Sequence, residues 1–373
     1  MRRNLKWIKF GNILLYITYF LLVFETFFGN LRGFSKVKGY FSIIEIAMLL
    51  FSIVLKYTYI DKKQIFLIIL IISISVLSFL HTKNSNIMFI LLFFIASKEL
   101  NFKKFLSIDV FIKMLYIVLL LFFLSVGLME NTFSFRENGK IRYTFGLNSP
   151  NTLGAIVLCL CMEVAYIKYQ KLSIKNSIVF IALAVLVSYI TASRASSFCL
   201  IIIALAPIFK NKIYLKNKLP YIFVIFTIFS FVLLILYEKN VSWINSLDKI
   251  LSYRIKCSYG FWKIYPTSIF GNKFADSKIW LGYANSLDNA YLDLIIHHGL
   301  LMYMMIFLLN MSITKRAIKD NDKLGVFLII VMEIYALMER APFTIIYNVF
   351  WLIKGNEILG EKNEENINNN SNL

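Results

Sequence analysis

The chain has 373 residues, of which 59% are hydrophobic, and it carries a net charge of +19 and a mean hydropathy of +0.69. A soluble protein of this length could not bury so much apolar surface, so the composition excludes a soluble enzyme and indicates an integral membrane protein. The positive charge does not require nucleic acid as a partner, because a basic surface facing anionic lipid headgroups accounts for it.

Long apolar segments separated by polar gaps follow one another along the chain. Because about 20 apolar residues in a helix cross a bilayer, we predict an all-α polytopic protein with about twelve transmembrane helices. Three short segments, 86–97, 196–209 and 342–353, are expected to be tilted, broken or re-entrant. The predicted spans are 8–28, 40–60, 64–80, 86–97, 108–128, 151–170, 175–192, 196–209, 220–237, 289–312, 324–338 and 342–353.

These spans are expected to form a single integral membrane domain, 1–360, with long outer loops at 129–150 and 238–288. The segment 361–373 is rich in Asn and Glu and has no periodicity, so we expect a disordered cytoplasmic tail. The first apolar segment lacks a small-residue cleavage site and is long enough to span, which favours a retained helix over a signal peptide. The four Cys show no metal-type spacing, and neither a metal nor a cofactor is expected.

The positions of the 40 Lys and Arg residues predict the orientation in the membrane. Nearly all of them lie in the gaps between the spans. If the loop 238–288 is left out, the N-terminal segment and every second gap after it hold more Lys and Arg residues than the other gaps do. Both termini are therefore expected to be cytoplasmic, in a multi-pass protein of the plasma membrane. Lys dominates the inner gaps, whereas most arginines lie in the outer ones: Arg32, Arg136, Arg142, Arg194, Arg254 and Arg340.

The arginines of the outer gaps indicate an anion-binding site. Membrane insertion explains a basic inner face, but it gives no reason for Arg on the opposite face. The rigid guanidinium fork binds phosphate and carboxylate groups through two parallel hydrogen bonds. The sequence therefore predicts a site that handles anions at the outer surface.

The first long outer loop ends at a helix start that suits an anion. Ser149 is a natural N-cap residue and Pro150 fits the first helical position, so free backbone N–H groups would face the outer surface. Arg142 lies just upstream, and Asn151 follows the cap. An ordinary turn with an interfacial Arg is the alternative interpretation.

The second long loop contains a predicted amphipathic helix. Leu247, Ile250, Leu251 and Ile255 recur at helical spacing, which suits a helix lying on the outer membrane surface with Arg254 on its other side. A surface connector with solvated charges is the alternative.

Two very short outer gaps each carry one Arg. Arg194 lies among small residues, from Thr191 to Ser197, which would leave room for a bulky ligand. Arg340 follows Glu339, and it is expected either to extend to the interface or to pair with that carboxylate, although a ligand contact stays open.

The last candidate residues cluster at the start of the tenth predicted span. Asn289, Asp293 and His297 are four residues apart and share one helix face, while Asp288 lies at the mouth. Ionisable groups within membrane helices usually face a cavity or a partner. The alternative is an Asp293–His297 pair that satisfies itself in the core of the bundle.

Three segments, taken with this layout of spans and loops, resemble a known family. They are Arg142-Tyr-Thr-Phe-Gly-Leu-Asn-Ser-Pro-Asn-Thr-Leu-Gly154, Thr191-Ala-Ser-Arg194, and Asp288-Asn-Ala-Tyr-Leu292 followed by Gly299. The chain resembles the Wzy-type polysaccharide polymerases of the O-antigen polymerase and ligase superfamily. Ligases of that superfamily carry His where this chain has Asp288, so the resemblance favours a polymerase. The Arg-x10-Gly motif of some of its polymerases is not reproduced, because the eleventh residue after Arg254 is Tyr265.

The resemblance implies a metal-independent, GT-C-like membrane glycosyltransferase that needs no cofactor. Its substrates would be oligosaccharide repeat units linked to undecaprenyl pyrophosphate, and its product a surface, capsular or exported polysaccharide. The partners expected are these lipid-linked oligosaccharides, membrane lipids, and chain-length regulator and flippase proteins, without nucleic acid. The expected catalytic residues are Asp288 as general base, with Arg194 and Arg142 on the pyrophosphate; the expected substrate-binding residues are Arg254, Asn151, Asn289, Asp293, His297 and Arg340.

Two other functions stay open at this point. A flippase or other transporter of lipid-linked oligosaccharides would also have many spans and buried charges, but it would be expected to show repeated halves and polar residues near the bilayer midplane. No internal repeat is evident in the sequence. A non-catalytic assembly or chain-length partner would explain the long loop but not the clustered arginines.

Overall fold

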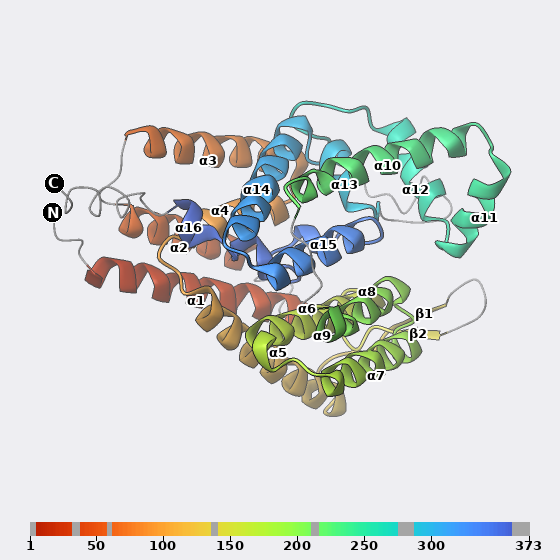
Figure 1. Ribbon diagram of the computed structural model, residues 1–373, viewed down its shortest axis with the longest axis horizontal. Coiled ribbons are helices and arrows are strands. Elements are labelled where there is room, and N and C mark those ends of the chain that lie inside the picture. The colour runs from red at the N-terminus through yellow and green to blue at the C-terminus, as the bar shows by residue number, and fades with distance from the viewer. Residues whose placement is uncertain are drawn as a thin grey trace.

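The computed structural model describes residues 5–31, 38–57, 62–135, 141–209, 216–274 and 287–359. Most of this part of the chain is helical (Figure 1), which confirms the predicted all-α class. Arg32, Arg136 and the segment 361–373 lie outside the described residues, as does part of the second long loop.

The elements are mainly α-helices, with a small hairpin and several short 3₁₀ turns (η). In chain order they are α1 (Leu5–Phe28), α2 (Lys38–Lys56), α3 (Lys62–Thr82), α4 (Asn86–Ala96), α5 (Phe102–Ser125), β1 (Phe133–Phe135), β2 (Ile141–Tyr143), α6 (Pro150–Ile167), η2 (Tyr169–Lys171), α7 (Ile174–Ile190), α8 (Arg194–Ala204), α9 (Ala206–Phe209), η3 (Leu219–Tyr221), α10 (Ile222–Glu238), α11 (Ser242–Ile250), α12 (Arg254–Ile264), α13 (Ala290–Ile296), α14 (Leu300–Lys319), α15 (Lys323–Ala336), η5 (Ala341–Phe343), η6 (Val349–Leu352) and α16 (Gly355–Leu359).

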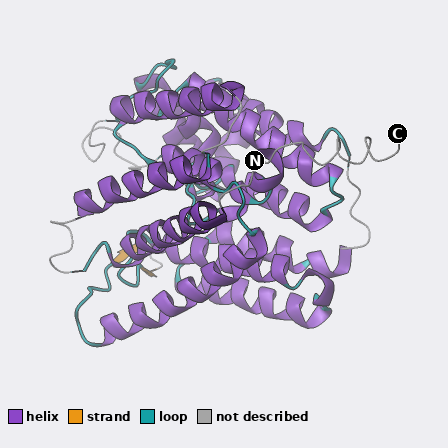
Figure 2. Cartoon of the chain, turned by 90° about the vertical axis from the view of Figure 1, so that its left-hand side faces the viewer, coloured by secondary structure: helices purple, strands orange, loops and turns teal. Residues whose placement is uncertain are grey.

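Within the described residues, six helical segments are long and apolar enough to cross a membrane. Figure 2 shows the long helices lying side by side as a bundle. Shorter apolar helices, among them α4 and α7, complete it. The six long segments are Leu5–Phe28, Gln64–Thr82, Phe102–Ser125, Pro150–Ile167, Leu219–Glu238 and Leu300–Lys319.

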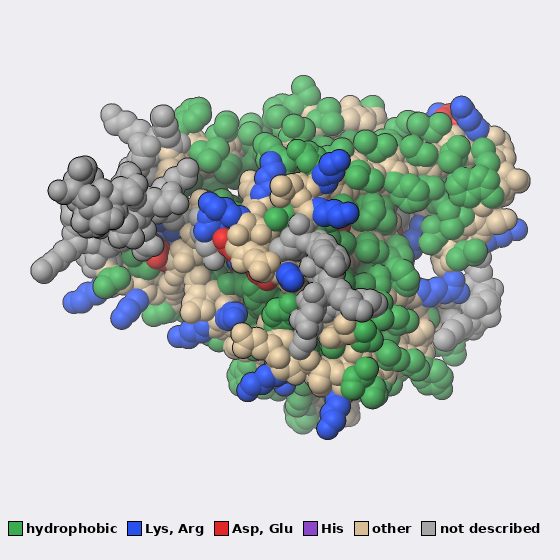
Figure 3. Space-filling view, viewed as in Figure 1, with side chains coloured by type: hydrophobic (Ala, Val, Ile, Leu, Met, Phe, Trp, Pro, Cys, Tyr) green, Lys and Arg blue, Asp and Glu red, His purple; other side chains and the backbone are tan. Residues whose placement is uncertain are grey.

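Large apolar side chains on the outside of the bundle support a membrane environment. Phe66 on α3 is 69% exposed, and Ile178 and Tyr189 on α7 are 63% and 77% exposed. Hydrophobic side chains cover broad continuous areas of the face drawn in Figure 3. Water-soluble proteins rarely expose apolar patches of this extent, whereas lipid tails solvate them.

The predicted span 289–312 is wrong as a single helix. It is divided into α13 and α14 by His297, His298 and Gly299, and Gly299 has a φ of +93°. Its Cα lies so close to the chain segment at 269–271 that an added Cβ would come within 2.3 Å of the Gly271 N atom. A residue with a side chain would be strained there, so the glycine allows the break.

The segment 342–353 is not an α-helix. It forms the 3₁₀ turns η5 and η6, and its side chains are buried in the bundle. The Pro342 carbonyl accepts hydrogen bonds from Trp351 Nε1 (2.9 Å) and Asn348 Nδ2 (3.1 Å). Side chains thus donate hydrogen bonds to a carbonyl that would accept a backbone N–H in a regular helix. Such contacts allow irregular backbone inside the bundle.

The amphipathic helix predicted in the second long loop is two helices. Ser252 and Tyr253, both with a φ of +59°, separate α11 from α12. The Asp248 side chain accepts from the Ile255 backbone N–H (2.8 Å) and so caps α12. Ile255 and Phe261 pack into a small core with Leu234 of α10, whereas Ile250 of the same predicted apolar face is 65% exposed.

Contacts between gaps follow the alternation seen in the sequence. Among the described residues, hydrogen bonds and ion pairs join residues of the gaps, or of the span ends next to them, within one alternate set or within the other. The two sets therefore occupy opposite ends of the bundle. Pairs at one end are Glu99–Asn356, Tyr166–Asp322 and Lys354–Asp320, and pairs at the other are Asn30–Gly146, Arg142–Thr191 and Arg194–Ile250.

Substitution of Gly299 tests the break between α13 and α14. Gly299→Ala should lower the free energy of unfolding by about 2 kcal/mol or more, because the new Cβ would collide with backbone atoms and the positive φ is strained. Gly127→Ala is the matched control: Gly127 also has a positive φ (+74°), but no atom lies within 4 Å of its added Cβ. Thermal unfolding in detergent measures both, and equal losses would contradict a role for close packing.

Candidate functional site: an arginine-lined cavity

A cavity of about 1270 Å³ lies at the end of the bundle where the arginine-bearing gaps meet. In Figure 1, α10 to α13 lie at the upper right, and α5 to α9 with the hairpin lie below them. The cavity is lined from both groups and from the end of α15. Its cationic lining residues are Arg142, Arg194, Lys249, Arg254 and Arg340.

Arg142 lies on the second strand of the hairpin, opposite Ser134. Its Nε donates to the Thr191 carbonyl (3.1 Å), and its Nη2 donates to Asn151 Oδ1. Burial lowers the pKa of the Arg142 guanidinium, an effect that the nearby Glu339 carboxylate partly offsets. The hairpin and the start of α6 therefore hold this guanidinium in the cavity wall.

Arg254 is the first residue of α12, and two carboxylates flank it. Its Nη2 lies 2.6 Å from Glu339 Oε1, and its Nε lies 3.5 Å from Asp288 Oδ2. Burial works against the charged guanidinium, but the Glu339 and Asp288 carboxylates outweigh that effect and raise the pKa of Arg254. The guanidinium stays charged in the cavity wall.

Glu339, just after α15, was not predicted as part of the site. It is 7% exposed, and besides Arg254 it accepts a hydrogen bond from Asn151 Nδ2 (2.9 Å). Burial raises the pKa of the Glu339 carboxyl, and the Arg254 guanidinium only partly counters the rise. A chain of contacts thus runs from Arg142 through Asn151 and Glu339 to Arg254.

The expected pairing of Arg340 with Glu339 is not found. Glu339 faces Arg254 and Asn151, whereas Arg340 is 45% exposed, lines the cavity and approaches Asp293 Oδ1 to 4.0 Å. Neighbouring residues in a non-helical turn point in different directions, so adjacency in sequence was a poor guide here.

Arg194 begins α8 and lines the cavity, and its Nη1 donates to the Ile250 carbonyl of α11 (3.1 Å). The small residues around it have a different role from the one expected. A Cβ added at Gly154 would lie 2.9 Å from Ser196 Oγ and 3.0 Å from Ser193 Cβ. Small side chains at these positions therefore let α6 and α8 pack closely, as in other membrane helix pairs.

Asp288 also lines the cavity, with its side chain 26% exposed. It precedes α13, and its Oδ2 faces Arg254 Nε across 3.5 Å. The structure thus brings Asp288, Arg142, Arg194, Arg254, Asn151 and Arg340 to one cavity, although their chemical roles stay predictions.

The other predicted binding residues, Asn289, Asp293 and His297, lie behind the cavity and outside its lining. Asn289 caps α13: its Oδ1 accepts from the Leu292 N–H (3.1 Å), and its Nδ2 donates to Ser230 Oγ (2.9 Å). These contacts hold the amide within the protein. A role of Asn289 in substrate binding stays a prediction.

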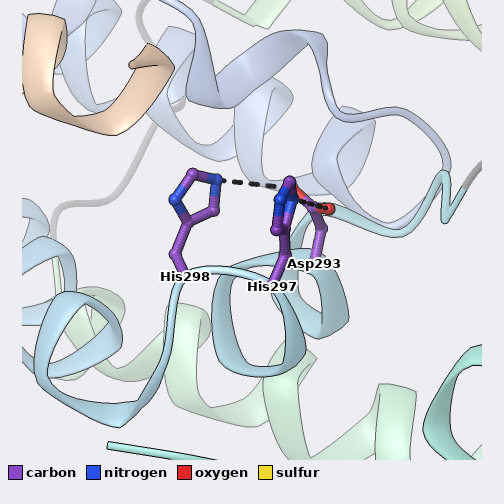
Figure 4. Close-up of side chains that lie close together, drawn as sticks. All are labelled: Asp293, His297 and His298. Atoms are coloured by element: carbon purple, nitrogen blue, oxygen red, sulfur yellow. Dashed lines mark hydrogen bonds and ion pairs between the residues drawn. The ribbon is translucent and has the colours of Figure 1, made fainter. Parts of the chain in front are cut away.

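Asp293 and His297 form the self-satisfied pair that the sequence left open as an alternative. Figure 4 shows Asp293, His297 and His298 together, with 3.3 Å between Asp293 Oδ1 and His297 Nδ1, and 3.9 Å between Asp293 Oδ2 and His298 Nε2. The donor atoms of the three lie within 4.8 Å of one another, a set that a divalent metal could use. The Arg340 guanidinium, 4.0 Å from the same carboxylate, already supplies positive charge there and would repel such a cation.

Part of the cavity wall was not predicted from the sequence. It consists of side chains of α1 and of the α3–α4 junction: Glu25, Thr26, Asn84, Ser85 and Asn86. Glu25 is an ionisable group within a predicted span, whereas the other four lie at gaps and helix ends that look like plain connectors. The amide and hydroxyl groups among them suit hydrogen bonding to an uncharged polar ligand.

Substitution of Asp293 separates the buried pair from the cavity. Asp293→Asn and His297→Ala should each lower the free energy of unfolding by about 1.5–3 kcal/mol, because a buried polar group loses its charged partner. His81→Ala, at an exposed histidine on α3, should change it much less. Thermal unfolding and membrane abundance measure this, and full stability of both variants would contradict a structural pair.

The geometry of the cavity is the basis for its function. No family model, curated protein or solved structure matches this chain. The chemistry of the cavity residues therefore carries the functional argument.

Proposed function

We propose that this protein is a membrane glycosyltransferase that polymerises oligosaccharide repeat units linked to undecaprenyl pyrophosphate. One observation carries the proposal: Arg142, Arg194, Arg254 and Asp288 come from three gaps that are separate in the sequence, and they line one cavity. The proposal includes a GT-C-like, metal-independent arrangement of about twelve spans. It also places both termini in the cytoplasm and the cavity at the outer face, as the inner lysines favour.

The arginines would bind the pyrophosphate of the donor. Bond cleavage between the anomeric carbon and the phosphate oxygen leaves negative charge on the departing pyrophosphate. Arg142 and Arg254 are held in place by protein contacts, so they can stabilise this charge without reorganising, which is the largest contribution in many enzymes. Arg194, at the start of α8, adds a third guanidinium from another side.

Asp288 would act as the general base. A hydroxyl of the acceptor repeat unit attacks the anomeric carbon, a new glycosidic C–O bond forms, and the hydroxyl proton passes to the Asp288 carboxylate. The carboxylate lies 3.5 Å from Arg254, so the group that takes the proton sits beside the group that would hold the leaving phosphate. The acceptor hydroxyl and the donor can thus meet as an oriented pair.

The size and surroundings of the cavity support two large substrates. At about 1270 Å³ it exceeds the usual 300–1,000 Å³ of small-molecule pockets. The exposed apolar helix faces around the bundle would contact the polyprenyl tails in the lipid. Sugar groups could then bind the wall of Asn and Ser side chains.

A transporter of lipid-linked oligosaccharides is the second candidate, because one observation favours it. Lys113 on α5 is fully buried, with its Nζ 2.8 Å from Asp109 Oδ2 and 2.6 Å from Glu163 Oε1. Ion clusters within membrane bundles often mark ion or proton pathways. The polymerase is preferred because none of the three side chains of this cluster lines the cationic cavity.

The fate of lipid-linked units on deletion of the protein tests the proposal. A polymerase deletion should leave single repeat units on the lipid at the outer face, because units arrive but are not joined. A transporter deletion should leave the same units at the inner face. Labelling with a membrane-impermeant sugar-oxidising reagent distinguishes the two, and protection of the units from that reagent would rule out the polymerase.

Asp288→Asn tests the general base. It keeps the size and hydrogen bonding of the side chain but removes basicity, so polymerisation by the purified protein should slow by about 10²–10⁴-fold without loss of folding. Asp320→Asn is the matched control, because Asp320 pairs with Arg316 and Lys354 at the other end of the bundle. Product length on gels measures both, and a near-normal rate for Asp288→Asn would remove this residue from the mechanism.

A further inference from the structure

Glu339 occupies a place that an anion-binding cavity would not be expected to give to a carboxylate. Four guanidinium groups and one ammonium group line the cavity. Glu339 is nevertheless buried in its wall, where it competes with any ligand phosphate for the same donors. Its backbone N–H donates to the Tyr335 carbonyl (2.9 Å), which ties it to the end of α15.

We propose that Glu339 is the positioning residue that presents Arg254 and Arg142 together to the two phosphates of one diphosphate ligand. The proposal rests on the proposed function, because it takes the ligand of the cavity to be a diphosphate. It goes further than that function, because it identifies Glu339 as the residue that makes the cavity selective for a diphosphate over a monophosphate.

The contacts show how one carboxylate controls two arginines. Glu339 Oε1 accepts from Arg254 Nη2 (2.6 Å) and from Asn151 Nδ2 (2.9 Å). The same Asn151 amide accepts, through Oδ1, from Arg142 Nη2. Since one amide has a fixed distance between its oxygen and its nitrogen, the positions of the two guanidiniums are coupled. Elements far apart in the chain, β2, α6, α12 and the end of α15, meet in these contacts.

Arg254 retains hydrogen-bonding capacity in this arrangement. A guanidinium has five N–H donors, and Glu339 and Asp288 contact Nη2 and Nε of Arg254. Among the described residues, Arg254 Nη1 is buried and has no hydrogen-bond partner. A buried donor without a partner is unfavourable, so a rotation of Arg254 that turns Nη1 toward a phosphate oxygen would satisfy this donor.

The alternative is that Glu339 is only a counterion for the crowded arginines. The two roles predict opposite signs for Glu339→Gln. Removal of a mere counterion raises the net positive charge of the cavity and should strengthen the binding of every anion. An uncharged amide binds the Arg254 guanidinium less tightly than a positioning carboxylate does, so Arg254 and Arg142 would be held less firmly and the binding of a diphosphate should weaken.

The experiment measures two ligands on the purified full-length protein in detergent: farnesyl diphosphate and farnesyl monophosphate. We expect the wild type to prefer the diphosphate. Glu339→Gln should bind the diphosphate about tenfold more weakly, the loss expected for one hydrogen bond to a charged group. Its affinity for the monophosphate, which needs only one arginine, should change much less. The preference for the diphosphate should therefore shrink.

The matched control is Glu238→Gln. Glu238 is also a carboxylate in an ion pair, 2.5 Å from Lys263 Nζ, but its side chain is 41% exposed at the end of α10 and does not line the cavity. Both affinities should stay at the wild-type level in this variant. A general effect of removing one negative charge from this end of the protein would change them.

A second variant covers the case in which Glu339→Gln does not fold. Asn151→Ala keeps the Glu339–Arg254 pair but removes the link to Arg142, so it should also reduce the preference for the diphosphate. Glu339→Gln or Asn151→Ala with an unchanged or tighter affinity for the diphosphate would overturn the positioning role. If the wild type binds neither ligand, the proposed function fails first.

Discussion

Repulsion among the cationic groups of one cavity is the constraint on which this site depends. Arg142, Arg194, Arg254, Arg340 and Lys249 line the same cavity, and like charges gathered in one place oppose folding unless carboxylates offset them. Glu339 and Asp288 flank Arg254 at 2.6 Å and 3.5 Å. The same contacts thus balance the charge and orient Arg254. They can form only where the end of α15, the start of α12 and the start of α6 meet.

In the rest of the bundle, too, polar groups are paired with one another where little water is available. Lys113 is fully buried between Asp109 and Glu163, and Asp293 is buried against His297 and near Arg340. Irregular backbone is tolerated at 297–299 and 342–353 because side chains and neighbouring segments satisfy its hydrogen bonds. Both of these interruptions of regular helix therefore lie in the interior of the protein.

Close packing at the cavity links fold to function. The small residues of the α6–α8 contact, Gly154, Ser193 and Ser196, bring the start of α8 against the start of α6. Arg194 is the first residue of α8, and Asn151 lies in the first turn of α6. A larger residue at Gly154 would separate the two helix starts, and with them two groups of the proposed pyrophosphate site.

The sequence by itself determined the class of protein, most helix positions and the arginines that gather at the cavity. Apolar periodicity and length depend on each segment alone, so α1, α3, α5, α6 and α10 could be recognised without their neighbours. The arginines could be recognised because insertion does not explain them. The break at Gly299, the 3₁₀ turns after Pro342 and the partners of Glu339 were decided only by the tertiary structure. The reason is physical: Gly299 meets Gly271, and Glu339 meets Arg254 from 85 residues away, so these features depend on which segments pack together and not on any local pattern.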